Sequence, residues 1–217
     1  MGAKNEKLVQ MKAIGITQFL DKSFDTYDVE GEWLDSFGLI EKNFKMSVTG
    51  DSGHGKTEFV VKFIKEICLK FNAKADYFSY EQGHSKSLQT AIQRNNMEEV
   101  KGKVMFITGG TFDELLTRLK RRASAKIVII DSQDYSELST KQYKELVKTF
   151  PRKSFIVVSW AKNEKPKNQA ARDIEYMSCI KVYVNSFKAY PRSRFGGNKP
   201  FVIWDRKETT PVQQKLF

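Results

Sequence analysis

A glycine-rich segment that ends in lysine and threonine has the clearest chemical signature in the chain. It fits the pattern GxxxxGK(S/T), and its residues are Gly50, Asp51, Ser52, Gly53, His54, Gly55, Lys56 and Thr57. Glycines allow the backbone N–H groups of such a segment to turn toward phosphate oxygens at the start of a helix. Lys56 would contact the β and γ phosphates, and the Thr57 hydroxyl would coordinate Mg²⁺, which prefers oxygen ligands. The segment therefore predicts a site for a nucleoside triphosphate with magnesium.

Two carboxylates are candidates to complete this site. Asp131 follows the apolar run 127–130, so it leaves a buried parallel strand at the edge where ligands of open α/β sheets bind. It suits a Mg²⁺ ligand, direct or through water, although an aspartate here could also cap the next turn. Many P-loop ATPases place a water-activating glutamate directly after this aspartate, but here the neighbour is Ser132. The next candidate is Glu81, at the end of another predicted strand, which on pattern alone could equally be an exposed loop residue.

The predicted elements bring these residues to one sheet. A strand over 44–48 runs into the glycine-rich segment, and a helix over 58–71 follows with one apolar face. Strand and helix patterns then alternate, with strands at 75–80, 104–107, 126–130 and 155–160 and helices at 85–94, from Thr111 onward, and at 143–150. Apolar strands separated by helices predict an α/β fold whose mostly parallel central sheet is flanked by helices.

Both ends of the chain depart from this alternation. Residues 180–184, 188–190 and 201–204 have the pattern of short antiparallel strands without helices between them, a C-terminal β extension. Residues 1–40 are an irregular lead-in that we expect to pack on the core, and residues 41–217 form the main domain. A length of 217 residues suits one α/β domain overall.

The composition limits the partners and the location. A net charge of +11 favours polyanions such as nucleic acid, but a basic surface neutralised by counterions is an equally good interpretation of charge alone. No apolar run approaches the roughly 20 residues that span a bilayer, so no membrane partner is expected. The lysine-rich residues 1–11 lack the apolar core of a secretion signal, which makes the cytoplasm the expected location.

These residues together resemble the RecA-like P-loop ATPases, the superfamily of RecA, RadA, the DnaB-type helicases and KaiC. The likeness covers most of residues 40–204 and rests on the glycine-rich segment, Glu81, the aspartate strand 127–132, and the segment Arg192-Ser193-Arg194-Phe195-Gly196. It implies a RecA-like core that binds ATP and Mg²⁺, in a compact form of the kind found in phages and mobile elements. It also implies that Glu81 activates the attacking water.

The same resemblance implies an oligomer. In those ATPases, basic residues in the counterpart of the 192–196 segment reach the γ phosphate of a neighbouring subunit, so Arg192 and Arg194 become arginine fingers in a homo-oligomeric ring or filament. Without the Phe-Gly that follows them, two surface arginines on a hairpin would be the better interpretation.

The resemblance further implies contact with DNA through two loops, here 133–138 and 161–171. The second carries Lys162, Lys165 and Lys167, as expected of a loop that follows a single-stranded backbone. Several relatives have a phosphate-sensing glutamine after the strand-end serine, whereas this chain has Trp160, which could be a core residue or could stack on a base.

The expected function is therefore a Mg-dependent, oligomeric ATPase that hydrolyses ATP and acts on DNA. The alternatives are a P-loop phosphotransferase with a small-molecule acceptor and a nucleotide-switched assembly scaffold. ATP is favoured over GTP because the sequence has no NKxD guanine-recognition motif.

Overall fold

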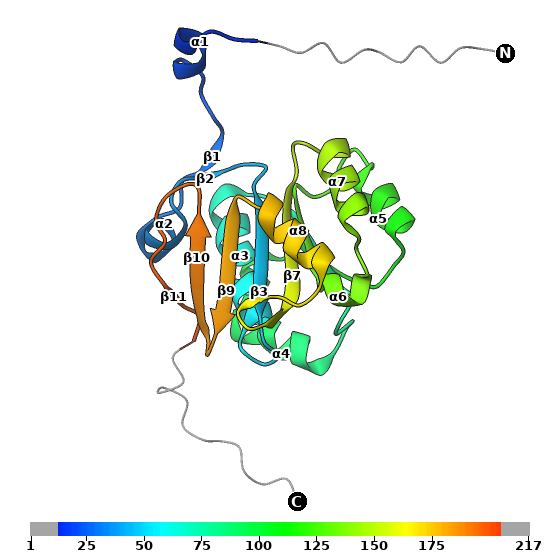
Figure 1. Ribbon diagram of the computed structural model, residues 1–217. Coiled ribbons are helices and arrows are strands. Elements are labelled where there is room, and N and C mark those ends of the chain that lie inside the picture. The colour runs from blue at the N-terminus through cyan, green and yellow to red at the C-terminus, as the bar shows by residue number, and fades with distance from the viewer. Residues whose placement is uncertain (1–12, 205–217) are drawn as a thin grey trace, which may run out of the picture.

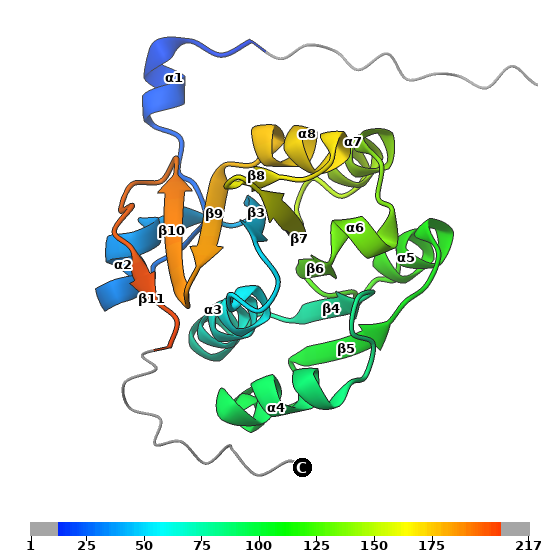
Figure 2. The same cartoon turned by 60° about the horizontal axis from the view of Figure 1, so that its bottom comes forward.

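The computed structural model describes residues 13–204 and has a central β-sheet with helices on both faces (Figures 1 and 2). The sheet contains β3 (Lys45–Gly50), β4 (Ala75–Ser79), β5 (Val104–Thr108), β6 (Ile127–Asp131), β7 (Ser154–Lys162), β8 (Lys165–Pro166), β9 (Ile180–Asn185), β10 (Lys188–Ser193) and β11 (Phe201–Val202). A separate two-stranded sheet pairs β1 (Thr26–Tyr27) with β2 (Ile40–Glu41).

The helices follow the strands in alternation through the middle of the chain. They are α1 (Ile16–Leu20), α2 (Gly31–Phe37), α3 (Lys56–Phe71), α4 (Lys86–Arg94), the 3₁₀ turn η1 (Met97–Val100), α5 (Phe112–Leu119), α6 (Gln133–Ser136), α7 (Thr140–Thr149) and α8 (Gln169–Met177). Thr111 caps α5 as its sequence predicts, because its hydroxyl accepts the Glu114 N–H while the Glu114 carboxylate accepts the Thr111 N–H.

The order of the strands is β11-β10-β9-β3-β7-β6-β4-β5, with β8 added beside β7. The block from β9 to β5 is parallel, and β10 and β11 complete the sheet as an antiparallel ribbon. Parallel strands end at the same edge of a sheet, so the segments that follow β3, β4, β6 and β7 all lie at one edge. The registers pair Gly50 with Trp160 and Ser79 with Asp131 at that edge.

Two hydrophobic cores lie on opposite faces of the sheet. Along β6, Ile127 and Ile129 belong to the core under α3, whereas Val128 and Ile130 belong to the core under α5 and α7. Successive side chains of a strand point to opposite faces, so a strand buried on both sides must be apolar at every position. The continuous apolar runs of the sequence are explained in this way, and the predicted α/β fold with its mostly parallel sheet is confirmed.

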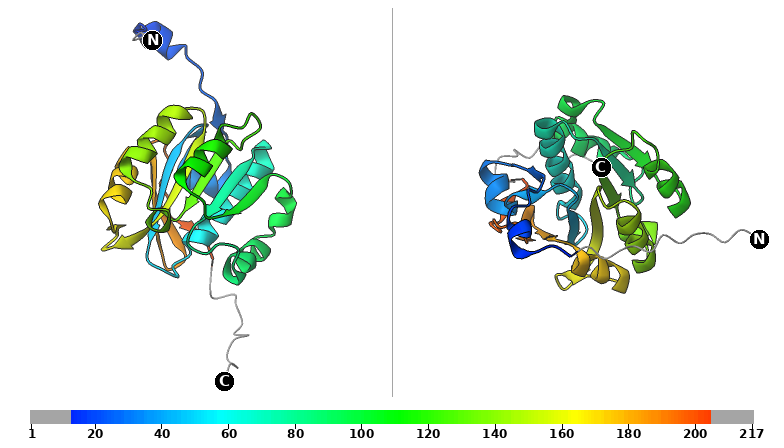
Figure 3. Two further views of the ribbon diagram at one scale, coloured as in Figure 1. Left: turned by 90° about the vertical axis from the view of Figure 1, so that its right-hand side faces the viewer. Right: turned by 90° about the horizontal axis from the view of Figure 1, so that it is seen from above.

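The lead-in packs on the core only in part. Helix α2 contributes Phe37 to the core below α3, but α1 has no buried residue and Ile16 is 83% exposed. Figure 3 shows α1 standing away from the body of the molecule. The predicted boundary at residue 40 stays a prediction, and residues 1–12 and 205–217, including the lysine-rich start, lie outside the described residues.

The C-terminal strands β9, β10 and β11 pair antiparallel to one another, as the sequence predicts. Strand β9 also pairs with β3 in parallel, because α8 precedes it and returns the chain to the start of the sheet. The predicted loop 161–171 is in fact a hairpin of β7 and β8 followed by the first turn of α8, whose N-cap is Asn168. The predicted loop 133–138 likewise contains the short helix α6.

Candidate nucleotide site

The Gly50–Thr57 loop connects β3 to α3 at the carboxyl edge of the sheet. Gly55 has a φ of +101°, and a Cβ there would lie 2.9 Å from Cδ1 of Phe187. A Cβ on Gly50 would lie 2.3 Å from the carbonyl oxygen of Val184. Both contacts are closer than carbon atoms tolerate, so the loop follows this path only with glycine at these two positions.

The turn between β9 and β10 braces the loop. Nδ1 of His54 lies 2.7 Å from Oδ1 of Asn185, and the N–H of Phe187 donates to the carbonyl of His54 at 3.1 Å. His54 is therefore held by its side chain and its backbone to a segment more than 130 residues away in the sequence. Its role in the structure is to fix the loop against the ribbon of β9 and β10.

The Lys56 side chain folds back over the loop. Its Nζ donates to the carbonyl oxygens of Gly50 and Asp51 at 2.8 and 2.9 Å, and the residue is 8% exposed. Burial lowers the pKa of Lys56, and the nearby carboxylates of Glu81 and Asp131 oppose that shift. Two hydrogen bonds thus hold the ammonium group against the backbone of the loop.

Thr57 and Asp131 come together as the sequence predicts. The Thr57 hydroxyl donates to Oδ2 of Asp131 at 3.4 Å, and Nε2 of Gln82 donates to the same hydroxyl oxygen at 3.5 Å. The Tyr77 hydroxyl donates to the same Asp131 oxygen from below, within the sheet. Burial raises the pKa of Asp131 to about 6, an effect that the hydrogen bond from Tyr77 partly offsets.

Glu81 lies beside this group, two residues beyond the end of β4. The backbone N–H groups of Tyr80 and Glu81 donate to the carbonyl of Asp131 at 2.6 and 3.2 Å, which fixes the turn that carries Glu81. Oε2 of Glu81 accepts a hydrogen bond from Nε1 of Trp160 at 3.3 Å. Trp160 is half-buried and belongs to neither hydrophobic core, so of the two roles left open by the sequence the core role does not hold.

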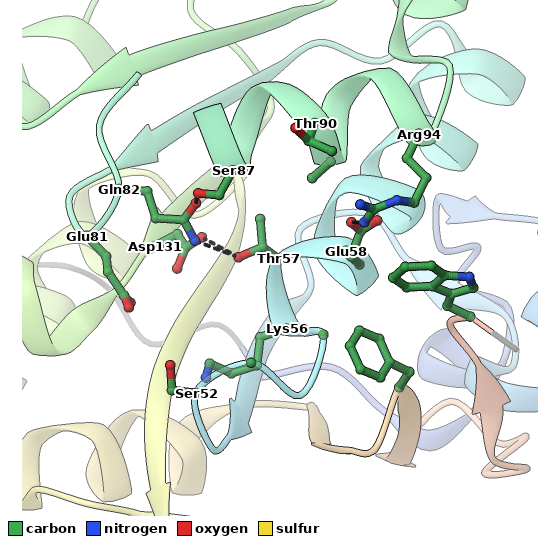
Figure 4. A pocket seen from close by; sticks show the side chains of 15 residues that line it. Ser52, Lys56, Thr57, Glu58, Glu81, Gln82, Ser87, Thr90, Arg94 and Asp131 are labelled. Carbon is green, nitrogen blue, oxygen red and sulfur yellow. Dashed lines mark hydrogen bonds and ion pairs between the residues drawn. The ribbon is translucent and has the colours of Figure 1, made fainter. Parts of the chain in front are cut away.

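A cavity of about 390 Å³ joins these residues (Figure 4). It is large enough for a small-molecule ligand. Its lining consists of Ser52, Gly53, Gly55, Lys56, Thr57, Glu58, Glu81, Gln82, Ser87, Thr90, Ala91, Arg94, Asp131, Phe187 and Trp204. Figure 4 shows Glu81, Gln82 and Asp131 on one side of Thr57, and Glu58 and Arg94 on the other.

The far end of the cavity is aromatic and was not found from the sequence. The Arg94 guanidinium lies 4.4 Å from the centre of the Trp204 ring, and the Phe187 and Trp204 rings meet edge to face at 5.4 Å. Glu58 forms an ion pair with Arg94 and accepts from Nδ2 of Asn95 at 2.6 Å. These residues come from α3, α4 and two late segments, so no local pattern connects them.

The donor set at Thr57 fits magnesium. It offers one buried carboxylate and one hydroxyl, both oxygen donors, and Mg²⁺ is held in such sites by one or two carboxylates while it keeps several waters. Between residues 13 and 204 no group of three or more His, Cys, Asp or Glu side chains is placed to hold a metal ion. Thr57 and Asp131 are thus the two side chains of this cavity that could hold Mg²⁺ through oxygen.

Arg192 and Arg194 are not part of this cavity. Both side chains are exposed. In the register of β9 and β10, Arg192 lies opposite Lys181 near the start of β9, whereas the Gly50–Thr57 loop contacts the other end of β9. The structure therefore does not bring these arginines to the Gly50–Thr57 loop of the same chain.

The three predicted lysines are also outside the cavity, on the hairpin of β7 and β8. Lys162, Lys165 and Lys167 are exposed, and Nζ of Lys167 lies 5.1 Å from the centre of the Trp160 ring. The hairpin is thus adjacent to the residue that contacts Glu81. Within the part of the chain that the structure describes, no helix is both long and apolar enough to cross a membrane.

The parallel sheet, the glycine-rich loop at its carboxyl edge and the C-terminal antiparallel hairpin define a RecA/KaiC-like α/β fold. The chain is similar in structure to a KaiC-like protein of the hyperthermophilic archaeon Pyrococcus horikoshii, with a TM-score of 0.53 and 17% sequence identity. The match covers 72% of this chain and 81% of that chain. At this identity the likeness shows the fold alone. No protein-family model and no curated protein matches the sequence.

Proposed function

We propose that the protein binds ATP with Mg²⁺ and hydrolyses it. The observation that carries the proposal is the convergence of Lys56, Thr57, Asp131 and Glu81 on one cavity at the carboxyl edge of the sheet. They come from three separate segments of the chain. Phosphoryl transfer requires a cation, metal ligands and a base, and these four side chains can supply them. The RecA/KaiC-like fold supports the same interpretation.

The side chains have distinct roles in the proposed reaction. Lys56 exchanges the carbonyls of Gly50 and Asp51 for phosphate oxygens, and the loop N–H groups donate to those oxygens. Water forms a new bond to the γ phosphorus, the bond from that phosphorus to the bridging oxygen breaks, and ADP leaves. Glu81 accepts the proton of the water. Thr57 and Asp131 would hold Mg²⁺, which would supply positive charge to the phosphate oxygens.

The aromatic end of the cavity supports an adenine base as the rest of the ligand. Arg94 is held by Glu58, and its guanidinium, Phe187 and Trp204 offer planar surfaces against which a base can stack. Trp204→Ala should weaken the binding of ATP and ADP by a similar factor, because both carry the base. If Trp204→Ala weakened the binding of ATP but not of ADP, the base would not lie at this end of the cavity.

Two substitutions test the chemistry. Lys56→Ala should abolish productive ATP binding, whereas Glu81→Gln should bind ATP normally and fail to release phosphate. Binding is measured with a fluorescent ATP analogue, and turnover by phosphate release. Normal hydrolysis by Glu81→Gln would refute the role of Glu81 as base. Phosphate release without any added acceptor distinguishes hydrolysis from transfer to a small molecule.

We propose further that Arg192 and Arg194 act on a neighbouring copy in a homo-oligomer. Their exposure and their distance from the phosphate loop of their own chain support action in trans. Arg194→Ala and Glu81→Gln should each be inactive alone, while a mixture should regain activity because some shared sites contain one intact half from each copy. A mixture as inactive as its components would contradict the shared site.

Single-stranded DNA is the proposed polyanion, with Lys162, Lys165 and Lys167 as its contacts. Their exposure on one small hairpin supports contact with a phosphate backbone. Affinity in an anisotropy assay should fall steeply with salt and differ between ATP and ADP, and the triple Lys→Gln variant should have a shallower salt dependence. If that variant bound single-stranded DNA as tightly as the wild type, the hairpin would not be part of the DNA interface.

A further inference from the structure

Trp160 occupies a fixed place between the sheet and the candidate catalytic carboxylate. It lies opposite Gly50 in the register of β3 and β7, and its backbone N–H donates to Oδ2 of Asp134 at 2.8 Å. The indole Nε1 donates to Oε2 of Glu81 at 3.3 Å. Strand pairing and the Asp134 contact hold the backbone of Trp160, and the indole, packed against the Tyr135 ring, directs its one donor at the Glu81 carboxylate.

The other faces of the same indole contact the lysine hairpin and α6. Nζ of Lys167 lies 5.1 Å from the ring centre, and the Lys167 N–H donates to the carbonyl of Trp160 at 2.9 Å. The Tyr135 ring meets the indole edge to face, with centres 5.4 Å apart. The hairpin residue Lys167 and the carboxylate of Glu81 are therefore both in direct contact with one rigid side chain.

We infer that Trp160 is a positioning residue for Glu81, and that it transmits the state of the lysine hairpin to that carboxylate. A carboxylate on a turn has several rotamers, and a charge-assisted hydrogen bond from a fixed donor selects one of them. The position of Lys167 in turn restrains the indole through the ring contact and the backbone hydrogen bond. The inference rests on the proposed hydrolysis and names a control of that same site.

Trp160→Phe is the direct test, because phenylalanine keeps an aromatic ring for Lys167 and Tyr135 but lacks the N–H donor. The variant should hydrolyse ATP about tenfold more slowly with KM for ATP within about twofold of wild type, because positioning the base affects the chemical step rather than binding. Tyr135→Phe is the matched control: it keeps the ring against the indole, and its kcat should be unchanged.

A pair of lysine variants tests the transmission. Lys167→Gln and Lys148→Gln each remove the charge of one exposed lysine, but Lys167 contacts the indole whereas Lys148 lies on α7. Lys167→Gln should lower kcat about threefold in the absence of any nucleic acid, and Lys148→Gln should leave it unchanged. Equal rates in the two variants would refute the transmission through Trp160.

A spectroscopic measurement checks the contact without turnover. Glu81→Ala should shift the tryptophan emission of the nucleotide-free protein, and the same substitution should cause no shift in a Trp160→Phe background. A shift that persists there would come from Trp33 or Trp204 and would contradict the contact. Circular dichroism confirms that each variant is folded.

The outcomes separate this inference from the proposed function. If Glu81→Gln is inactive and Trp160→Phe has the wild-type kcat, the inference is wrong and the hydrolysis proposal stands. If the wild-type protein releases no phosphate from ATP, the proposed function and the inference both fail.

Discussion

Asp131→Asn should stabilise the nucleotide-free protein at neutral pH. The Asp131 carboxylate is 4% exposed, and burial raises its pKa from the ordinary value of 3.8 to about 6. Asparagine has nearly the same shape, and its amide oxygen can still accept from the hydroxyls of Tyr77 and Thr57, which both donate to one oxygen of Asp131. The substitution therefore removes a buried charge without leaving a cavity.

The magnitude follows from the pKa. One pKa unit corresponds to about 1.4 kcal/mol, and the difference between 3.8 and about 6 is about two units, so the ionised carboxylate costs the folded state about 3 kcal/mol. Between pH 4 and pH 6 the folded wild type binds more protons than the unfolded chain, so its stability falls as the pH rises. The variant lacks this titration, and its advantage should be near zero below pH 4 and complete above pH 6.

Urea unfolding followed by circular dichroism, in EDTA and without nucleotide, measures this difference at pH 4 and pH 7.5. A gain of about 3 kcal/mol corresponds to an increase of about 6 to 12 °C in Tm for a chain of this size. A variant that is less stable than wild type at pH 7.5 would refute the reasoning. With Mg²⁺ and ATP the order should reverse, since ligand binding stabilises only the protein that retains the metal ligand.

Three further substitutions test separate features. Gly55→Ala places a Cβ at a left-handed φ and against Phe187, so ATP affinity should fall more than tenfold and stability by about 1 to 3 kcal/mol, measured by analogue binding and urea unfolding. Arg118→Met leaves the buried carboxylate of Asp76 without its bidentate partner, and urea unfolding should show a loss of about 3 kcal/mol; an unchanged midpoint would contradict the pairing. Thr111→Ala removes a helix cap and should cost about 1 kcal/mol in thermal unfolding, whereas Thr111→Ser should cost little.

Local patterns predicted most elements well because their causes are local. The strand expected at 75–80 is Ala75–Ser79, and the helix expected at 85–94 is Lys86–Arg94 with Ser85 as its cap. The apolar residues that indicate each element lie within it, and the residue that caps the helix directly precedes it. Helix α8 was missed because its buried face consists of Ala171 and Ile174, too few apolar residues to give a clear period.

The contacts between elements could not be predicted from spacing. Nothing near Ile180 indicates that β9 pairs in parallel with β3, since that pairing depends on the return of the chain through α8. The hydrogen bond from Trp160 to Glu81 joins residues 79 positions apart, and the ion pair of Glu58 with Arg94 joins residues 36 apart. The phosphate loop motif predicted where a ligand would bind, and the packing of distant segments determines what surrounds it.

The antiparallel ribbon of β9 and β10 contacts the Gly50–Thr57 loop at one end and carries Arg192 at the other. Its turn holds His54 of the phosphate loop, and its opposite end carries Arg192, which lies about 13 Å further along if each strand residue advances by roughly 3.3 Å. A paired ribbon tilts as one body and does not stretch. Because β9 is also paired with β3, a shift that a ligand causes at the loop would move the ribbon together with β3 and so reach Arg192, which in the proposed homo-oligomer faces the neighbouring copy. Distances between spin labels at Lys188 and Arg192, and from each label to the loop, would reveal whether the ribbon moves as a unit.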